Sequence, residues 1–176
     1  MSQTITLGGG CFWCLEAVYE LVDGVESVES GYANGQVVDP SYEQVCGGRT
    51  GHAEVVRVTF DEARIGLDEI LAIFFVIHDP TTRDRQGNDV GTQYRSGIYW
   101  HDEAQRPVID RVLGEVNKMV GGRAVTEVAP VTNYWRAEDY HQHYFARNPG
   151  QGYCAFVVAP KVEKFRKTFR ERVRSA

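Results

Sequence analysis

The sequence predicts an α+β fold, a mixed α/β sandwich in which helices cover a single sheet. Two observations support this prediction. Short segments rich in β-branched residues alternate with segments whose apolar residues recur at helical spacing, in an order close to βαββαβαβ. The chain has 176 residues, 43% of them hydrophobic and 24% charged, which is enough to bury one core. We therefore expect residues 1–176 to form one domain.

The first half of the chain alternates strand and helix. Residues 5–7 predict a short strand that runs into three glycines, and residues 12–21 keep helical apolar spacing. Residues 25–32 alternate weakly, and residues 53–60 are rich in Val and Thr, so both segments are expected to be strands. Residues 67–78 predict an apolar helix that stops before a proline.

The second half continues the pattern. Strands are expected at residues 96–100 and 125–128. A helix is expected at residues 102–119, with its proline in the first turn and two glycines at its end. Residues 139–145 and 161–173 also have helical spacing.

Residues 79–95 are a polar stretch without a hydrophobic period. Loops longer than about 12–15 residues in compact domains are usually functional or disordered. The amide and carboxylate side chains of this stretch are able to bond its own backbone. We therefore expect an ordered loop that lines a site.

Composition excludes several classes of protein. The net charge of −5 and a pI near 5.5 argue against a nucleic-acid binder. The longest apolar run, residues 70–77, is too short to span a membrane, and the first residues do not resemble a secretory signal. We expect a cytoplasmic protein with no membrane partner, in which cysteines are buried, metal-bound or reactive.

Cys11 and Cys14 follow a strand and a glycine turn at the start of a predicted helix. We expect Cys11 in the first helical turn, where free N–H groups and the helix dipole would favour a thiolate. Cys14 lies one turn on, so a disulfide between the two is allowed. The alternatives are two core cysteines, or half of a zinc site completed by Cys46 and Cys154.

Two further signals surround this thiol. Phe12 and Trp13 are either core residues or a pocket for a small apolar group next to sulfur, and we favour the pocket. Glu54 shares a strand face with apolar residues, so its pKa is expected to rise and the neutral carboxyl to serve as a general acid. The alternative is a Glu54 side chain that points to solvent at the sheet edge.

The remaining candidates are polar residues on segments expected to be irregular. Tyr42 and Tyr94 offer phenolic donors, and Asp89 lies five residues before Tyr94. His141 and His143 are potential metal ligands, but on a helix they would face different sides.

Several blocks together resemble the A-type peptide-methionine sulfoxide reductases. The blocks are Gly10-Cys11-Phe12-Trp13, Thr50-Gly51-His52-Ala53-Glu54, Gly87-Asn88-Asp89-Val90-Gly91-Thr92-Gln93-Tyr94-Arg95-Ser96, Tyr42-Glu43-Gln44-Val45-Cys46, Tyr140-His141-Gln142 and Gly152-Tyr153-Cys154. They extend from near residue 5 to about residue 167. The resemblance implies a two-layer α/β sandwich with a mixed β-sheet and a ferredoxin-like core.

The resemblance also implies an activity: reduction of the S epimer of methionine sulfoxide, free or in oxidised proteins, with thioredoxin as reductant and no cofactor or metal. Cys11 would attack the sulfoxide sulfur and become a sulfenic acid. Phe12 and Trp13 would hold the substrate methyl group. Glu54 would protonate the oxygen, helped by hydrogen bonds from Tyr42 and Tyr94, and Asp89 would join the polar network.

The resolving thiol stays open at this stage. Cys154 matches the Tyr-Cys position that resolves the sulfenic acid in many members of the family, whereas Cys14 stands where many members carry glycine. Either thiol could resolve Cys11, or Cys14 could resolve it and pass the disulfide to Cys154. The rival hypotheses are a thiol–disulfide oxidoreductase that uses Cys11 and Cys14, and a zinc-stabilised binding domain.

Overall fold

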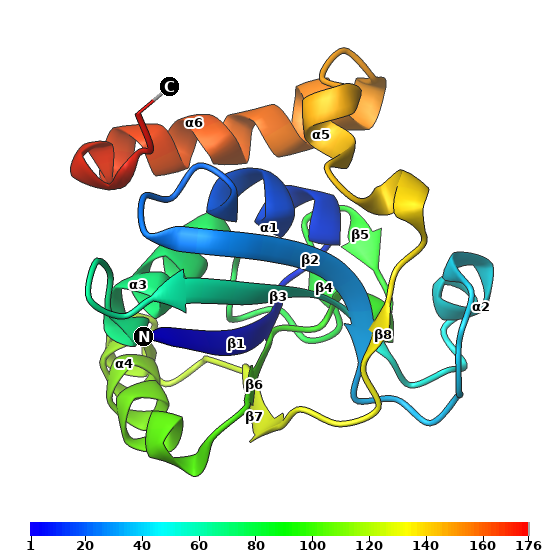
Figure 1. Ribbon diagram of the computed structural model, residues 1–176. Helices are drawn as coiled ribbons and strands as arrows, with labels where there is room; N and C mark the ends of the chain where they lie inside the picture. The colour runs from blue at the N-terminus through cyan, green and yellow to red at the C-terminus, as the bar shows by residue number, and fades with distance from the viewer. Residues whose placement is uncertain (176) are drawn as a thin grey trace.

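The computed structural model describes residues 1–175, and a six-stranded mixed sheet lies at its centre (Figure 1). The sheet order is β7-β6-β1-β3-β2-β8. Neighbouring strands are antiparallel except β6 and β7, which are parallel. The strands of this sheet are β1 (Ser2–Gly8), β2 (Val25–Ala33), β3 (Ala53–Asp61), β6 (Gly97–Trp100), β7 (Glu127–Pro130) and β8 (Trp135–Arg136).

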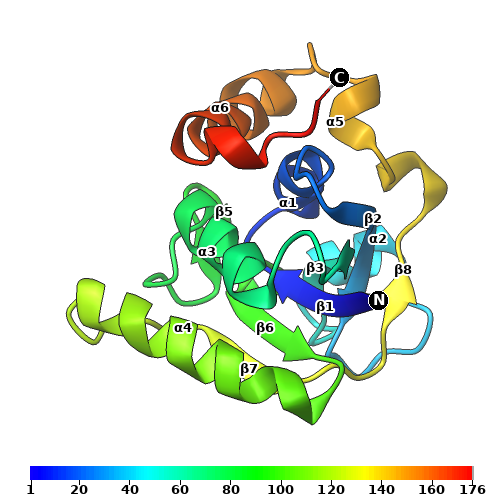
Figure 2. The ribbon, with the colours of Figure 1, turned by 60° about the vertical axis from the view of Figure 1, so that its left-hand side comes forward.

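α1 and α3 contribute to the main core with the central strands, and α6 packs on these two helices. Figures 1 and 2 show α1 next to the sheet and α6 on the far side of α1. α1 connects β1 to β2 and α3 connects β3 to β6, so the four central strands, in the order β6-β1-β3-β2, form the expected ferredoxin-like core. The helices are α1 (Phe12–Tyr19), α2 (Tyr42–Cys46), α3 (Leu67–Ile77), α4 (Arg106–Met119), α5 (Tyr144–Arg147) and α6 (Ala159–Thr168). Within residues 1–175, no helix combines the length and the apolarity that crossing a bilayer requires.

The central strand β3 explains why the core forms as it does. Val56, Val58 and Phe60 alternate along β3 and belong to the main core together with the apolar faces of α1 and α3. Val55 points to the opposite face and packs in a smaller cluster with Tyr99. Both faces of β3 are therefore covered in the first half of the strand, where Glu54 lies.

Residues 79–95 are ordered, as expected. They contain the two-stranded hairpin β4 (Arg85–Gln86) and β5 (Asp89–Val90), followed by a 3₁₀ turn at Thr92–Tyr94. The Gly10 N–H donates to the Tyr94 carbonyl at 3.2 Å. Gly10 has φ +88°, and a Cβ there would lie 2.9 Å from the Gln86 side chain, so only glycine lets the hairpin pack this closely.

The structure corrects several expected boundaries. The strand expected at 125–128 lies two residues later because β7 pairs in parallel with β6, and the Val125 N–H bonds the Pro80 carbonyl instead. The helix expected at 139–145 is interrupted at His143, which has φ +56°.

Two helices also differ from expectation. The segment that carries Tyr42 was expected to be irregular but forms α2, because Ser41 and Gln44 make a capping box. The last helix begins earlier than residue 161, after a π-helical turn at Cys154–Val158, and ends at Thr168.

Candidate active site

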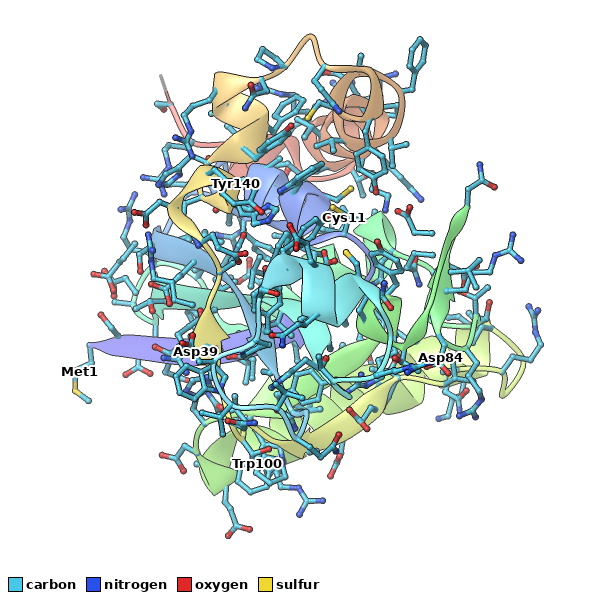
Figure 3. All side chains as sticks on the ribbon, turned by 90° about the vertical axis from the view of Figure 1, so that its right-hand side faces the viewer. Met1, Cys11, Asp39, Asp84, Trp100 and Tyr140 are labelled. Carbon is cyan, nitrogen blue, oxygen red and sulfur yellow. The ribbon has the colours of Figure 1, made fainter. Side chains whose placement is uncertain are left out.

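Cys11 lies between β1 and α1, at the N-cap of α1 and one residue before the expected first turn. The chain reaches it through the glycines that end β1, and the side chain is 7% exposed. Figure 3 shows the Cys11 side chain under the start of α1, between the Tyr140 segment and the hairpin side of the molecule. Its sulfur is therefore almost enclosed but not sealed from solvent.

Glu54 is buried on β3, paired with Tyr32 of β2 in the sheet register. Its Oε1 accepts a hydrogen bond from the Phe12 backbone N–H at 3.2 Å, while Oε2 is buried without a hydrogen-bond partner. Burial, together with the nearby charge of Asp89, raises the pKa of Glu54 to about 8. At neutral pH the side chain is thus a protonated acid, and Oε2 is the oxygen left free to carry the proton.

The structure does not support the expected thiolate at Cys11. Burial raises the pKa of Cys11 well above its usual value, and the neighbouring Glu54 and Cys14 add to the rise. The Trp13 backbone N–H and the Tyr153 hydroxyl lower the pKa, but they do not outweigh burial. The helix N-terminus therefore does not ionise this thiol by itself, because burial removes the water that would solvate the thiolate.

Tyr153 connects the two thiols to the hairpin. Its hydroxyl donates to Asp89 Oδ2, and hydrogen bonding by the same hydroxyl lowers the pKa of both Cys11 and Cys14. Cys14 is buried on the first turn of α1, and burial raises its pKa to about 11 although the charge of Lys161 opposes the rise. Cys11, Cys14, Tyr153 and Asp89 thus form one connected group.

The other two cysteines have different surroundings. Cys154 is buried, and burial alone raises its pKa, with no contribution from Cys11 or Cys14. Cys46 is exposed because it is the last residue of the short surface helix α2. The zinc hypothesis needed all four cysteines in one place, and among residues 1–175 no group of potential metal ligands includes a cysteine.

Aromatic rings form one wall next to Cys11. Phe12 is fully buried and stacks on Tyr42 with ring centroids 6.4 Å apart. Trp13 is partly exposed and stacks on Tyr144 at 3.8 Å, and its Nε1–H donates to His141 Nδ1 at 3.1 Å. Of the two predicted pocket residues, Trp13 is therefore the one that presents a ring surface at the rim.

Tyr42 and Tyr94 come from separate segments, α2 and the 3₁₀ turn after the hairpin, and both are half-buried. Burial raises the pKa of each phenol, and Glu54 is the next contribution in both cases. The two hydroxyls are therefore neutral donors in the electrostatic range of Glu54. The structure thus gathers the predicted residues Cys11, Glu54, Tyr42, Tyr94 and Asp89 around one point.

Three residues of this site had no assigned role in the sequence analysis. Tyr153 lowers the pKa of both thiols. His141 accepts a hydrogen bond from the Trp13 ring, and Glu138 accepts hydrogen bonds from the Tyr32 hydroxyl and the Tyr42 backbone N–H. Tyr153 and His141 belong to the sequence blocks that resemble the reductase family, so membership in these blocks could have indicated them. Glu138 follows β8, a two-residue strand without a sequence pattern, and nothing singled it out.

Comparison with known proteins places the chain among enzymes of known class. Residues 3–173 match the family model described as peptide methionine sulfoxide reductase. This chain is a peptide methionine sulfoxide reductase by family. The match covers nearly the whole chain, and the sequence resemblance to this family is confirmed.

Individual relatives of the reductase agree. The peptide methionine sulfoxide reductase MsrA of Psychrobacter cryohalolentis is 56% identical over 96% of this chain and 97% of that protein. The reduced form of Mxr1 from Saccharomyces cerevisiae has a TM-score of 0.83 and 40% identity, over 87% of this chain and 89% of that one. Mxr1 in its complex with Trx2 matches with a TM-score of 0.59 and 29% identity, over 81% of this chain and 84% of that one. The fold predicted for the reductase is thus that of its solved relatives.

Proposed function

We propose that this reductase converts the S epimer of methionine sulfoxide, free or in oxidised proteins, to methionine, with Cys11 as the nucleophile. The observation that carries the proposal is the pairing of a nearly enclosed thiol with a protonated Glu54 whose Oε2 has no other partner. A sulfoxide oxygen is a poor leaving group until it is protonated. Cys11 and Glu54 supply the nucleophile and the acid that this reaction needs.

The first step is balanced without an outside proton. Glu54 gives its proton to the sulfoxide oxygen while the Cys11 sulfur attacks the sulfoxide sulfur, and the thiol proton returns to Glu54. The sulfur–oxygen bond of the substrate breaks as the oxygen passes to Cys11, which becomes a sulfenic acid, and methionine leaves. Tyr42 and Tyr94 donate hydrogen bonds to the oxygen, and Trp13, backed by Phe12, holds the methyl group beside the sulfur.

Cys14 is the thiol that resolves the sulfenic acid in this proposal. Its backbone N–H bonds the Cys11 carbonyl at 3.1 Å, and the Tyr153 hydroxyl acts on both sulfurs. Cys154, in contrast, is not among the main groups that shift the pKa of Cys11. Attack of the Cys14 sulfur on the sulfenic sulfur forms the Cys11–Cys14 disulfide and releases water.

The disulfide is then reduced by a dithiol protein of the thioredoxin class. Its thiolate attacks one sulfur to form a mixed disulfide, and its second thiol releases the reduced enzyme. The yeast relative solved with Trx2 supports this partner. Such a cycle suits the cytoplasm, where thiols are kept reduced.

A stereospecific assay tests the proposal. Separate S and R methionine sulfoxides are offered with a dithiol reductant, and the methionine released is counted. We expect turnover of the S epimer only, and none in Cys11→Ser. Normal turnover by Cys11→Ser would refute the assignment of the nucleophile, and reduction of disulfides but not of sulfoxides would favour the thiol–disulfide oxidoreductase hypothesis.

A further inference from the structure

A second cluster of titratable side chains lies on α1, beyond the residues used above. Glu16 is on α1, Glu20 caps its end, and His143 belongs to the segment that leads into α5. One potential ligand atom from each of the three lies within 4.8 Å of the others. Among residues 1–175 this is the single group of three or more such side chains that could hold a metal ion.

Glu16 is the member that points to a missing ligand. The side chain is 1% exposed. Its Oε1 accepts a hydrogen bond from the Tyr144 backbone N–H at 3.3 Å, and its Oε2 is buried without a partner. A buried carboxylate oxygen without a donor destabilises the folded state, because it has lost its hydrogen bonds to water and has no replacement for them.

His143 supplies the complementary chemistry. Its backbone has φ +56°, and its Nδ1 contacts Glu20 Oε1. The adjacent Tyr144 is fixed by its stack on Trp13, so His143 is attached to a positioned segment. Two carboxylates and one imidazole, from α1 and from this segment, thus lie together.

We propose that Glu16, Glu20 and His143 bind a divalent cation of the zinc type. Zinc accepts imidazole nitrogen and carboxylate oxygen, and three protein ligands plus water complete its tetrahedral shell. The ion would supply Glu16 Oε2 with its missing partner. It would also tie α1 to the segment that carries Tyr144, and so hold the Trp13–Tyr144 stack in place.

The experiment must separate this cluster from the thiols, which also bind zinc. The probe is Co²⁺, titrated into the reduced full-length protein and followed by absorption, because thiolate ligation gives an intense near-ultraviolet charge-transfer band and nitrogen–oxygen ligation does not. The variants are Glu20→Gln and His143→Asn, since Asn tolerates φ above zero. Glu163→Gln is the control, because Glu163 is an exposed glutamate on α6 that pairs with Arg166.

We expect one Co²⁺ per chain with weak visible bands in the parent protein and in Glu163→Gln. Glu20→Gln and His143→Asn should bind more weakly by at least the roughly tenfold that even outer-shell changes cost. Zn²⁺ should raise the melting temperature of the parent protein and of the control but not of the two cluster variants. Equal binding by all four proteins, a thiolate band that accounts for all the bound metal, or no saturation with Co²⁺ would each overturn the proposal.

Discussion

Glu54 and Phe12 are joined by a hydrogen bond in which the Phe12 backbone N–H donates to Glu54 Oε1 at 3.2 Å. Phe12 is the first residue of α1, so this N–H is one of the donors that a helix leaves free at its start. The helix N-terminus therefore serves the acid as well as the thiol. This bond lowers the pKa of Glu54, yet burial wins and the carboxyl keeps its proton at pH 7.

The first reductive step should follow the protonated form of Glu54. The pKa of Glu54 is about 8, so the proton is present below pH 8 and lost above it. We expect the single-turnover rate of methionine formation to be flat from pH 6 to 7.5 and to fall above pH 8. Glu54→Gln should be slower by about 10²- to 10⁴-fold because an amide does not deliver the proton. A rate that climbs steadily through pH 9 would instead indicate that the thiolate is the reacting form.

The same residue should make stability depend on pH. In the unfolded chain the carboxyl has its ordinary pKa of 4.5, whereas in the folded protein the pKa is about 8. Between these values the folded state holds a proton that the unfolded state releases, so the free energy of unfolding falls as the pH rises, by up to about 1.4 kcal/mol per pH unit. Glu54→Gln should remove this loss and be relatively more stable at pH 8 than at pH 5, measured by urea unfolding. An equal difference from the parent protein at both pH values would contradict the raised pKa.

The two candidate resolving thiols should behave differently. We expect Cys14→Ser to form one methionine per chain and then to stop cycling with thioredoxin, because Cys14 is the thiol among the main groups that shift the pKa of Cys11. Cys154→Ser is the matched control, a buried cysteine outside the connected group, and should cycle normally. Turnover with thioredoxin would be measured for each variant beside a single-turnover count. Loss of cycling in Cys154→Ser but not in Cys14→Ser would reverse the assignment.

Tyr153 should tune both thiols. Removing its hydroxyl in Tyr153→Phe takes away a hydrogen bond that lowers the pKa of Cys11 and Cys14, so both pKa values should rise. Alkylation of the two thiols at pH 8, followed by mass spectrometry, should slow several-fold. Tyr140→Phe is the control, because Tyr140 is exposed and neither of these thiols contributes to its ionisation. Unchanged alkylation in Tyr153→Phe would show that the hydroxyl matters only for packing.

Gly10 should be intolerant of a side chain. Alanine there would adopt φ +88° and place Cβ 2.9 Å from Gln86, which pushes away the hairpin that carries Asp89. We expect Gly10→Ala to lose about 1–3 kcal/mol of unfolding free energy and most of its activity. Gly114→Ala is the control, inside α4 with open space at the Cβ position, and should gain up to about 1 kcal/mol. Similar melting temperatures for Gly10→Ala and the parent protein would show that the hairpin adapts.

Local patterns were sufficient to predict most of the fold. The alternation at 53–60 and the apolar period at 67–78 arise because residues on one face of each element are buried at regular intervals. Both elements lie within one residue of the expected bounds. The short edge strands were harder to predict. β7 takes its register from β6, and β8 has two residues, so neither has a period of its own.

The ionisation of the site could be predicted for Glu54 but not for Cys11. Burial of Glu54 followed from its strand face, and burial alone raises the pKa of a carboxyl. The Cys11 prediction considered the helix N-terminus and omitted the desolvation that comes with burial of the thiol in the folded chain. A helix start that is visible in the sequence therefore does not indicate how exposed to solvent its N-cap side chain is.

α6 and the turn before it lie over α1 and supply Tyr153, and both come from the last part of the chain. On the ribosome, Cys11 and Cys14 emerge long before the segment that shields them. Until synthesis ends, the two cysteine sulfurs are therefore exposed to oxidants from which the folded protein shields them.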